Sequence, residues 1–387
     1  MNTNQKILPI IVLAQFCCTS LWFAGNAVMG ELLADFQLET SALGHLTSAV
    51  QLGFISGTLV FASLNIADRF SPSKVFFVAA IIGGIFNLGT LWSGNTLVTL
   101  IIFRLLTGFS LAGIYPVGMK IAADYFDKGL GKSLGFLVGA LVLGTAFPHF
   151  LKAFTAGLPW RFVIQFTSAL ALGGGLLIAS MIPDGPHRKA ASKLDLSAIF
   201  KVFQKTSFRA AAWGYFGHMW ELYAFWTFVP IILTTYHSLH PKTFFDTSLW
   251  SFSIIGIGSL GCILGGILSQ RFGSKQIASK ALSLSCICCL LSPLLFIQGS
   301  KILFLIFLLI WGLAVVADSP LFSTLVAHNA PAENKGTALT IVNCVGFAIT
   351  IFSIQLLNFL RQEFDLRYIY LWLAIGPVLG LIGLLRK

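Results

Sequence analysis

Twelve hydrophobic stretches, each close to the ~20 residues that an α-helix needs to cross a bilayer, fill almost the whole chain. Charged residues make up only 10 % of the sequence, against ~25 % in a soluble domain, which excludes a water-facing globular fold. Because no water satisfies backbone groups inside a bilayer, stretches of this length predict helices rather than shorter barrel strands. We therefore expect an all-α membrane protein. The predicted spans are 8–29, 42–66, 75–94, 97–124, 134–155, 162–182, 208–233, 248–270, 276–298, 302–327, 337–360 and 368–385.

Lysine and arginine fall mostly on one side of the predicted membrane. With the N-terminus in the cytoplasm, seventeen of the twenty-five basic residues lie on cytoplasmic segments and six on outside loops. Cytoplasmic loops are enriched in Lys and Arg, so both termini are expected in the cytoplasm. This topology explains the formal net charge of +11 without a nucleic-acid partner. We expect a multi-pass protein of a cell membrane and place it in the bacterial inner membrane.

A polar stretch at 183–207 divides the chain into an N-terminal half, 1–182, and a C-terminal half, 208–387. Within this cytoplasmic linker, "LSAIFKVFQ" (196–204) has apolar residues at helical spacing with a lysine between them. Such a pattern predicts a short helix lying on the inner membrane surface. Each half is expected to contain six membrane helices.

The two halves repeat short sequence patterns. "ADRFSPSK" at 67–74 is echoed by "SQRFGSK" at 269–275, and "GIYPVGM" at 113–119 is echoed by "ADSPLFS" at 317–323. Internal duplication of this kind predicts two six-helix pseudo-repeats. Parallel repeats place a solute site near the midplane between the halves, which can rock to open either side.

These segments resemble the major facilitator superfamily, and the resemblance covers essentially the whole chain. It rests on Gly57 before "NIADRF", on "RLLTGFSLAG" beginning at Arg104, and on Gly266 in "GGILSQRFGSK". The resemblance implies the twelve-helix fold and a latch that closes the cytoplasmic side. The antiporter motif with a Gly-Pro pair is absent from "GALVLGTAFPHF", so the direction of transport stays open. The residues assigned to the latch are Asp68, Arg69, Lys74, Asp124 and Arg271.

Ionisable residues inside the predicted spans are rare, and each is costly in a membrane unless it is paired or hydrated. Glu221 lies near the middle of the seventh span in "GHMWELYAFW", three residues after His218, so the two side chains share a helix face. A carboxyl in this setting can load and release a proton as the cavity alternates between sides. Glu221 and His218 are therefore the predicted coupling site. The alternative is a buried glutamate tied structurally to His218 or to a neighbouring helix.

Asp318 and Arg104 are further candidates for coupling or solute binding. Asp318 lies two residues before Pro320, where a proline frees backbone carbonyls, so it either contacts solute or satisfies groups at a kink. Arg104 matches the arginine of the family's fourth-helix motif, which implies either proton coupling or the organisation of helices around the cavity. Lys120 with Asp124 at i+4 is expected to be a structural pair.

Polar and aromatic residues on the spans that line the family's cavity are expected to include solute contacts. Trp22, Trp220 and Trp226 can form an aromatic wall for a flat or amphipathic solute. The cysteine runs lack the His or acid spacing of a metal site, and we expect neither a metal nor a cofactor. The cavity candidates are Gln15, Trp22, Asn26, Gln51, His149, Trp220, Trp226 and Asn343.

The sequence contains no phosphate loop, nucleophile elbow or zinc signature, so neither ATP-driven pumping nor an enzyme activity has support. It favours a proton-coupled secondary transporter that moves a small polar organic solute or anion by alternating access, as a monomer in the lipid bilayer. The alternative is a multidrug-type proton antiporter that exports lipophilic compounds. A third hypothesis is a transporter-like sensor or assembly protein, which would bind solute without flux.

Overall fold

The computed structural model describes residues 3–126, 130–155, 157–188, 202–297, 299–331 and 335–386. In these ranges the regular structure is entirely helical. Contacts within the chain divide it into two compact units, Met1–Leu194 (unit 1) and Asp195–Lys387 (unit 2). In the described ranges, nine helical stretches are long and apolar enough to cross a membrane, and three of them join two consecutive helices. The chain is therefore a multi-pass membrane protein of the all-α class.

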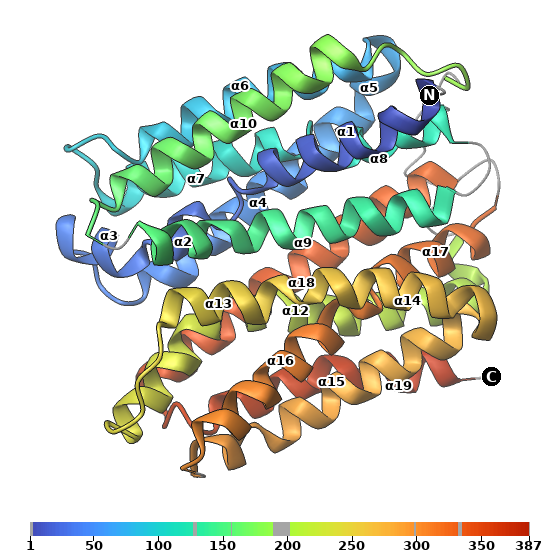
Figure 1. Cartoon of the computed structure of the whole chain (residues 1–387). Coiled ribbons are helices and arrows are strands. Elements are labelled where there is room, and N and C mark those ends of the chain that lie inside the picture. Colours follow the sequence, from blue (N-terminus) through green and yellow to red (C-terminus); the bar gives the residue numbers. More distant parts are fainter. Residues whose placement is uncertain are drawn as a thin grey trace. The chain divides into compact units, whose positions relative to one another are not determined.

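Unit 1 is a bundle in which helices distant in sequence pack side by side. Helix α4 packs along α7, α6 packs along α10, and α1 lies against both α9 and α10. Figure 1 shows α10 running beside α6. The helices are α1 (Thr3–Thr19), α2 (Ala24–Ala27), α3 (Met29–Asp35), α4 (Ala42–Ser63), α5 (Ile66–Arg69), α6 (Pro72–Gly89), α7 (Leu97–Leu111), α8 (Tyr115–Tyr125), α9 (Leu130–Phe154) and α10 (Arg161–Met181).

Unit 2 is organised around its longest helix, α12, which contacts most of the others. Helices α18 and α19 make the most extensive contacts with α12, and α13, α16 and α17 also touch it. The helices are α12 (Thr206–Leu239), α13 (Thr247–Gly256), α14 (Gly258–Phe272), α15 (Ser274–Ile297), α16 (Lys301–Ala317), α17 (Ser319–Asn329), α18 (Lys335–Glu363), the 3-10 helix η2 (Ile369–Ala374) and α19 (Ile375–Leu385).

All twelve predicted stretches overlap helices, but the first, second, fourth, eighth and tenth each contain a break, and the twelfth changes from a 3-10 helix to an α-helix at Ile375. In the fourth and tenth the new helix begins beside Pro116 or Pro320, because a proline lacks the N–H that would continue the ladder. The prediction that the third span reaches residue 94 is wrong, since α6 ends at Gly89. The predicted surface helix at 196–204 lies mostly outside the described residues. The count of twelve spans, the cytoplasmic termini and the linker at 183–207 stay predictions.

Glycines allow some helices to meet backbone to backbone. A Cβ at Gly53 or Gly108 would collide with the backbone of the opposing helix in the α4–α7 pair; for Gly108 the obstacle is the Val50 carbonyl oxygen. In unit 2, Gly217 of α12 and Gly376 of α19 face each other's carbonyl oxygens in the same way. Such close approach is a common way to pack membrane helices, because dispersion contacts and not water exclusion hold them together.

Candidate functional site

The carboxylate of Glu221 lies inside unit 2, where α12, α15 and α16 meet. It accepts hydrogen bonds from Trp311 Nε1 at 2.6 Å, from Cys289 Sγ at 3.2 Å and from Ser285 Oγ. Trp311 packs on Phe225 with ring centroids 4.5 Å apart, which orients its indole N–H. Only 1 % of Glu221 is exposed, and neighbouring helices hold it, as the structural alternative supposed. A serine hydroxyl donates or accepts, so these contacts also suit a protonated carboxyl.

His218 and Asp318 form a second buried pair in unit 2. His218 Nδ1 of α12 lies 2.8 Å from Asp318 Oδ1, at the break between α16 and α17, and each side chain is 1 % exposed. Tyr215 and Phe322 flank the imidazole at 6.1 and 6.0 Å between ring centroids. Within the part of the chain that the structure describes, His218 Nε2 and Asp318 Oδ2 have no hydrogen-bond partner. An imidazole and a carboxylate at this distance can share or release one proton.

The partner of His218 differs from the one that the sequence had indicated. Among the contacts of the described residues, His218 pairs with Asp318 and not with Glu221, which has partners of its own. The Asp318 carboxylate does not cap α17. At the kink, only the backbone carbonyl of Asp318 accepts hydrogen bonds, from the N–H groups of Leu321 and Phe322. Asp318 therefore has a side chain available for a role other than capping.

Arg104 is buried in unit 1, where it binds the backbone carbonyls at the break between α1 and α2. Nη1 donates to the Leu21 carbonyl at 3.2 Å and to Asn87 Oδ1 at 3.4 Å, and Nη2 donates to the Trp22 carbonyl at 2.5 Å. No carboxylate among the described residues lies within ion-pair distance of this guanidinium. These contacts favour the organising role that the sequence had left open beside coupling.

Asn87 connects Arg104 to α10, and it is not among the residues predicted from the sequence. Its Nδ2 donates to Ser168 Oγ at 2.9 Å, to Thr167 Oγ1 at 3.2 Å and to the Ile164 carbonyl at 3.3 Å. The amide is thereby oriented with its oxygen toward Arg104. A lone asparagine in the apolar run "IIGGIFNLG" was the available signal, since polar groups inside a membrane need partners.

Several buried polar atoms in unit 1 lack any partner among the described residues. They include both amide atoms of Gln15 and of Gln51, Nε2 of His149 and Oγ1 of Thr145. These residues lie on α1, α4 and α9 and are between 0 and 2 % exposed. Three of them were predicted cavity residues, and Thr145 was not. Unpartnered polar atoms in a buried setting call for a physical explanation.

The other cavity candidates of unit 1 have partners within the unit. Asn26 Nδ2 donates to Thr47 Oγ1 at 2.8 Å, which joins α2 to α4. Trp22 is 1 % exposed and packs on Phe54 with ring centroids 4.9 Å apart. Both residues therefore help to hold the interrupted first span against α4.

The candidates of unit 2 do not form one aromatic surface. Trp220 is partly exposed and donates from Nε1 to the Trp372 carbonyl of η2 at 3.1 Å. Trp226 is fully buried and makes an edge-to-face contact with Tyr223 at 5.2 Å. Asn343 lies on α18 and is partly buried. The two tryptophans thus have different neighbours.

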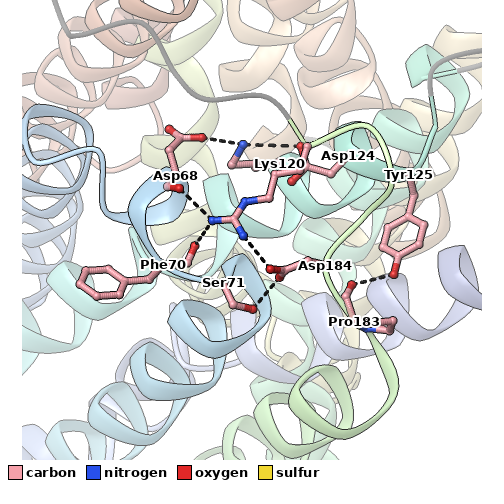
Figure 2. A network of polar contacts seen from close by, with 9 residues as sticks. Asp68, Phe70, Ser71, Lys120, Asp124, Tyr125, Pro183 and Asp184 are labelled. Carbon is pink, nitrogen blue, oxygen red and sulfur yellow. Dashed lines mark hydrogen bonds and ion pairs between the residues drawn. The ribbon is translucent and has the colours of Figure 1, made fainter.

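Charged and polar residues at one end of unit 1 form the network of Figure 2, here called the unit 1 polar network. Lys120 Nζ lies 2.7 Å from Asp68 Oδ1 and 3.5 Å from Asp124 Oδ1. Arg188 donates to Asp184 Oδ2 at 2.6 Å and to the carbonyls of Asp68 and Phe70 at 2.8 and 2.7 Å. Its residues are Asp68, Phe70, Ser71, Lys120, Asp124, Tyr125, Pro183, Asp184 and Arg188.

The unit 1 polar network contains only two of the five residues predicted to form the latch. Asp68 and Asp124 belong to it, whereas Arg69 and Lys74 are exposed and make no ion pair with the described residues. Arg271 is also exposed, and its guanidinium lies 5.2 Å from the Phe272 ring centroid. The cation that pairs with the carboxylates of Asp68 and Asp124 is Lys120, and Arg188 joins the network through Asp184. The acid four residues before Arg188 in "PDGPHR" was the signal available in the sequence.

Replacing Arg188 by alanine is expected to lower the free energy of unfolding by about 1–2 kcal/mol, because one carboxylate and two carbonyls lose a charged donor. Thermal unfolding in detergent measures the effect. The matched control is Arg69→Ala, which removes an exposed arginine and should leave the melting temperature unchanged. Equal shifts for the two variants would contradict the assignment of Arg188 to the network.

The candidate residues do not coincide with the surface pockets found in unit 2. One pocket, of about 320 Å³, lies beside Trp250 and Lys301, and another, of about 450 Å³, lies beside Lys275 and Lys280. Neither is lined by a predicted coupling or cavity residue. In the described ranges no group of three His, Cys, Asp or Glu side chains is placed to hold a metal ion.

Long apolar helices with buried polar and ionisable clusters between them are typical of a polytopic membrane protein. A family model described as Major Facilitator Superfamily matches residues 11–354. The chain therefore belongs to the major facilitator superfamily. The fold agrees with the solved inward-open structure of the xylose transporter XylE from E. coli, with a TM-score of 0.77 and 16 % identity over 98 % of this chain and 95 % of that one.

The curated relatives that are similar in sequence include two named transporters. A protein named as a probable sulfoacetate transporter, SauU from Cupriavidus necator, is 24 % identical over 70 % of this chain. The 4-hydroxybenzoate transporter PcaK from Pseudomonas aeruginosa is 29 % identical over 36 % of it. The matched regions span 66 % and 34 % of the lengths of these relatives.

Proposed function

We propose that this protein is a secondary transporter that moves a small organic acid across the membrane by alternating access, coupled to protons. The observation that carries the proposal is the pair of buried ionisable sites in unit 2, one at Glu221 and one at His218 and Asp318. Three such groups inside an apolar bundle are expensive to maintain, and in membrane proteins they mark proton or solute pathways. Coupling through them would use the proton gradient as the energy source.

Both sites are built to hold a proton. Glu221 has donors on both carboxylate oxygens, one of which, the Ser285 hydroxyl, can reverse its role when the carboxyl is protonated. His218 Nε2 and Asp318 Oδ2 have no partner among the described residues, so each can form a further hydrogen bond when the helices move. We infer that α12 carries the coupling residues and that α15, α16 and the α16–α17 break supply their partners.

The class of solute is inferred from unit 1 and from the relatives. Sulfoacetate and 4-hydroxybenzoate, the solutes named for SauU and PcaK, are both small organic acids. Unit 1 offers buried hydrogen-bond donors with no partner among the described residues, at Gln15, Gln51 and Thr145. Donors of this kind suit carboxylate or sulfonate oxygens.

The same proposal includes twelve spans in two six-helix pseudo-repeats, both termini in the cytoplasm, a bacterial inner membrane location and a monomeric state. The unit 1 polar network would then lie at the cytoplasmic side and act as the latch. Arg104 would organise the interrupted first span rather than bind solute, because carbonyls and Asn87 take its bonds.

Flux measured in proteoliposomes tests the proposal. Sulfoacetate, 4-hydroxybenzoate, amino acids, sugars and lipophilic cations are offered with and without an imposed pH gradient. We expect an organic acid to move, and to move faster with the gradient. Flux of lipophilic cations alone would replace the proposal by multidrug export, and binding without flux would replace it by a sensor.

A further inference from the structure

The hydroxyl of Thr145 behaves unlike those of most other buried threonines in the described helices. The usual arrangement is a bond from the hydroxyl to the carbonyl four residues earlier, which satisfies the group inside its own helix. Thr145 on α9 is 0 % exposed, yet its hydroxyl has no partner in the described part of the chain. Thr58, at 9 % exposed, shares this property. The threonines with the usual bond are Thr19, Thr47, Thr107, Thr167 and Thr227.

His149 lies one turn after Thr145 on α9, so the two side chains share a face of this helix. His149 is 2 % exposed, and its Nε2 also lacks a partner among the residues that the structure describes. An i, i+4 pair of buried and unpartnered polar groups is a costly arrangement in a membrane helix. This cost is offset if the two groups bind a partner that is present only during part of the transport cycle.

Gln15 of α1 lies near the same level of the bundle. A Cβ at Gly144, the residue before Thr145, would collide with Thr19 Oγ1 and the Phe16 carbonyl, so α9 touches α1 within a turn of Gln15. A Cβ at Gly118 of α8 would collide with Gln15 Oε1, so the absence of a side chain there makes room for the amide. Helices α1, α8 and α9 contact one another pairwise.

We propose that Thr145, His149 and Gln15 form a recognition surface in unit 1 for the carboxylate or sulfonate group of the transported acid. Each offers a donor: a hydroxyl, a ring N–H and an amide NH₂. All three are shielded from water in this structure, so solute reaches them when the surrounding helices move, as alternating access requires. The inference rests on the proposed function and adds its specificity residues, of which Thr145 is new.

Thr145→Val tests the inference, because valine keeps the shape of threonine and removes the hydroxyl. Affinity for sulfoacetate and 4-hydroxybenzoate is measured by calorimetry on the purified full-length protein, with melting temperatures recorded with and without each acid. We expect affinity to fall about tenfold or more, as for loss of a hydrogen bond to a charged group. The melting temperature without acid should stay the same or rise, since an unsatisfied hydroxyl is gone. The acid-dependent rise should shrink.

Two variants serve as controls. Thr107→Val removes an equally buried hydroxyl whose bond goes to the Phe103 carbonyl, so acid affinity should be unchanged. Thr145→Ser keeps the hydroxyl and should bind acid like the wild type. If Thr145→Val does not fold, the comparison of His149→Gln, which keeps an N–H donor, with His149→Leu replaces it, and only the leucine variant should lose affinity.

The outcomes separate the two proposals. If the wild type binds an acid and Thr145→Val binds it equally well, the recognition surface is wrong and the transporter proposal stands. Equal losses in Thr145→Val and Thr145→Ser would also overturn the role of the hydroxyl. If the wild type neither binds nor moves either acid, the proposed solute class fails, and the inference fails with it.

Discussion

Replacing Glu221 by glutamine is expected to abolish proton-coupled transport while the protein stays folded and still binds solute. Glutamine can reproduce the present contacts: its oxygen accepts from Trp311 and Cys289, and its NH₂ donates to Ser285, whose hydroxyl turns to accept. What glutamine cannot do is bind and release a proton. The expected result is flux at the rate of empty liposomes when a pH gradient is the only driving force.

Three readouts check the prediction for Glu221→Gln. The melting temperature and the affinity for solute should match the wild type, whereas gradient-driven flux should be lost. Thr227→Val on the same helix, which removes a hydroxyl bonded to the Tyr223 carbonyl, is a matched control and should keep coupled flux. Wild-type pH-dependent flux in Glu221→Gln would remove Glu221 from the coupling site. The pair of His218 and Asp318 would then be tested by Asp318→Asn.

Arg104→Met is expected to lower the free energy of unfolding by about 1–3 kcal/mol, the range for leaving buried hydrogen-bond acceptors without their donor. Methionine fills a similar volume, so the loss is chiefly that of the donors to the Leu21 and Trp22 carbonyls and to Asn87. The carbonyls at the break between α1 and α2 would be left without this donor in an apolar interior. We expect α2 and α3 to lose their fixed position relative to α4 and α9.

Thermal unfolding and flux together test this role of Arg104. Arg161→Met is the control, because its side chain is 47 % exposed and its contact with Asp35 is long, at 3.3 Å; its effect should stay below about 1 kcal/mol. An organising role predicts that Arg104→Met weakens binding of neutral and anionic solutes alike. Selective loss of anionic solutes at an unchanged melting temperature would instead make Arg104 a solute ligand.

Hydropathy was enough to predict the helical segments, because a bilayer leaves few alternatives for an apolar stretch of ~20 residues. It was not enough to predict every break. Pro116 and Pro320 mark two interruptions in the sequence, but the break after Thr19 has no proline beside it. Its carbonyls are bound by Arg104, more than eighty residues away, so the cause lies in tertiary contacts.

The candidate site was predictable in its members and not in its pairing. Glu221, His218 and Asp318 stand out in the sequence because ionisable residues are rare inside apolar spans. Their partners could not be predicted, because Trp311 and Ser285 reach Glu221 from other helices and are ordinary residues for a membrane span. Thr145 was missed for a related reason, since only a structure shows that its hydroxyl makes no bond within its own helix.

Proton movement that accompanies solute flux is the decisive test of proton-coupled transport. Proteoliposomes containing a pH-sensitive dye are given sulfoacetate or 4-hydroxybenzoate, and internal pH is followed together with solute uptake. Proton coupling predicts that solute entry changes internal pH, with acidification for symport and alkalinisation for antiport, and that Glu221→Gln removes the change. Solute flux without proton movement, and without a response to an imposed pH gradient, would contradict it.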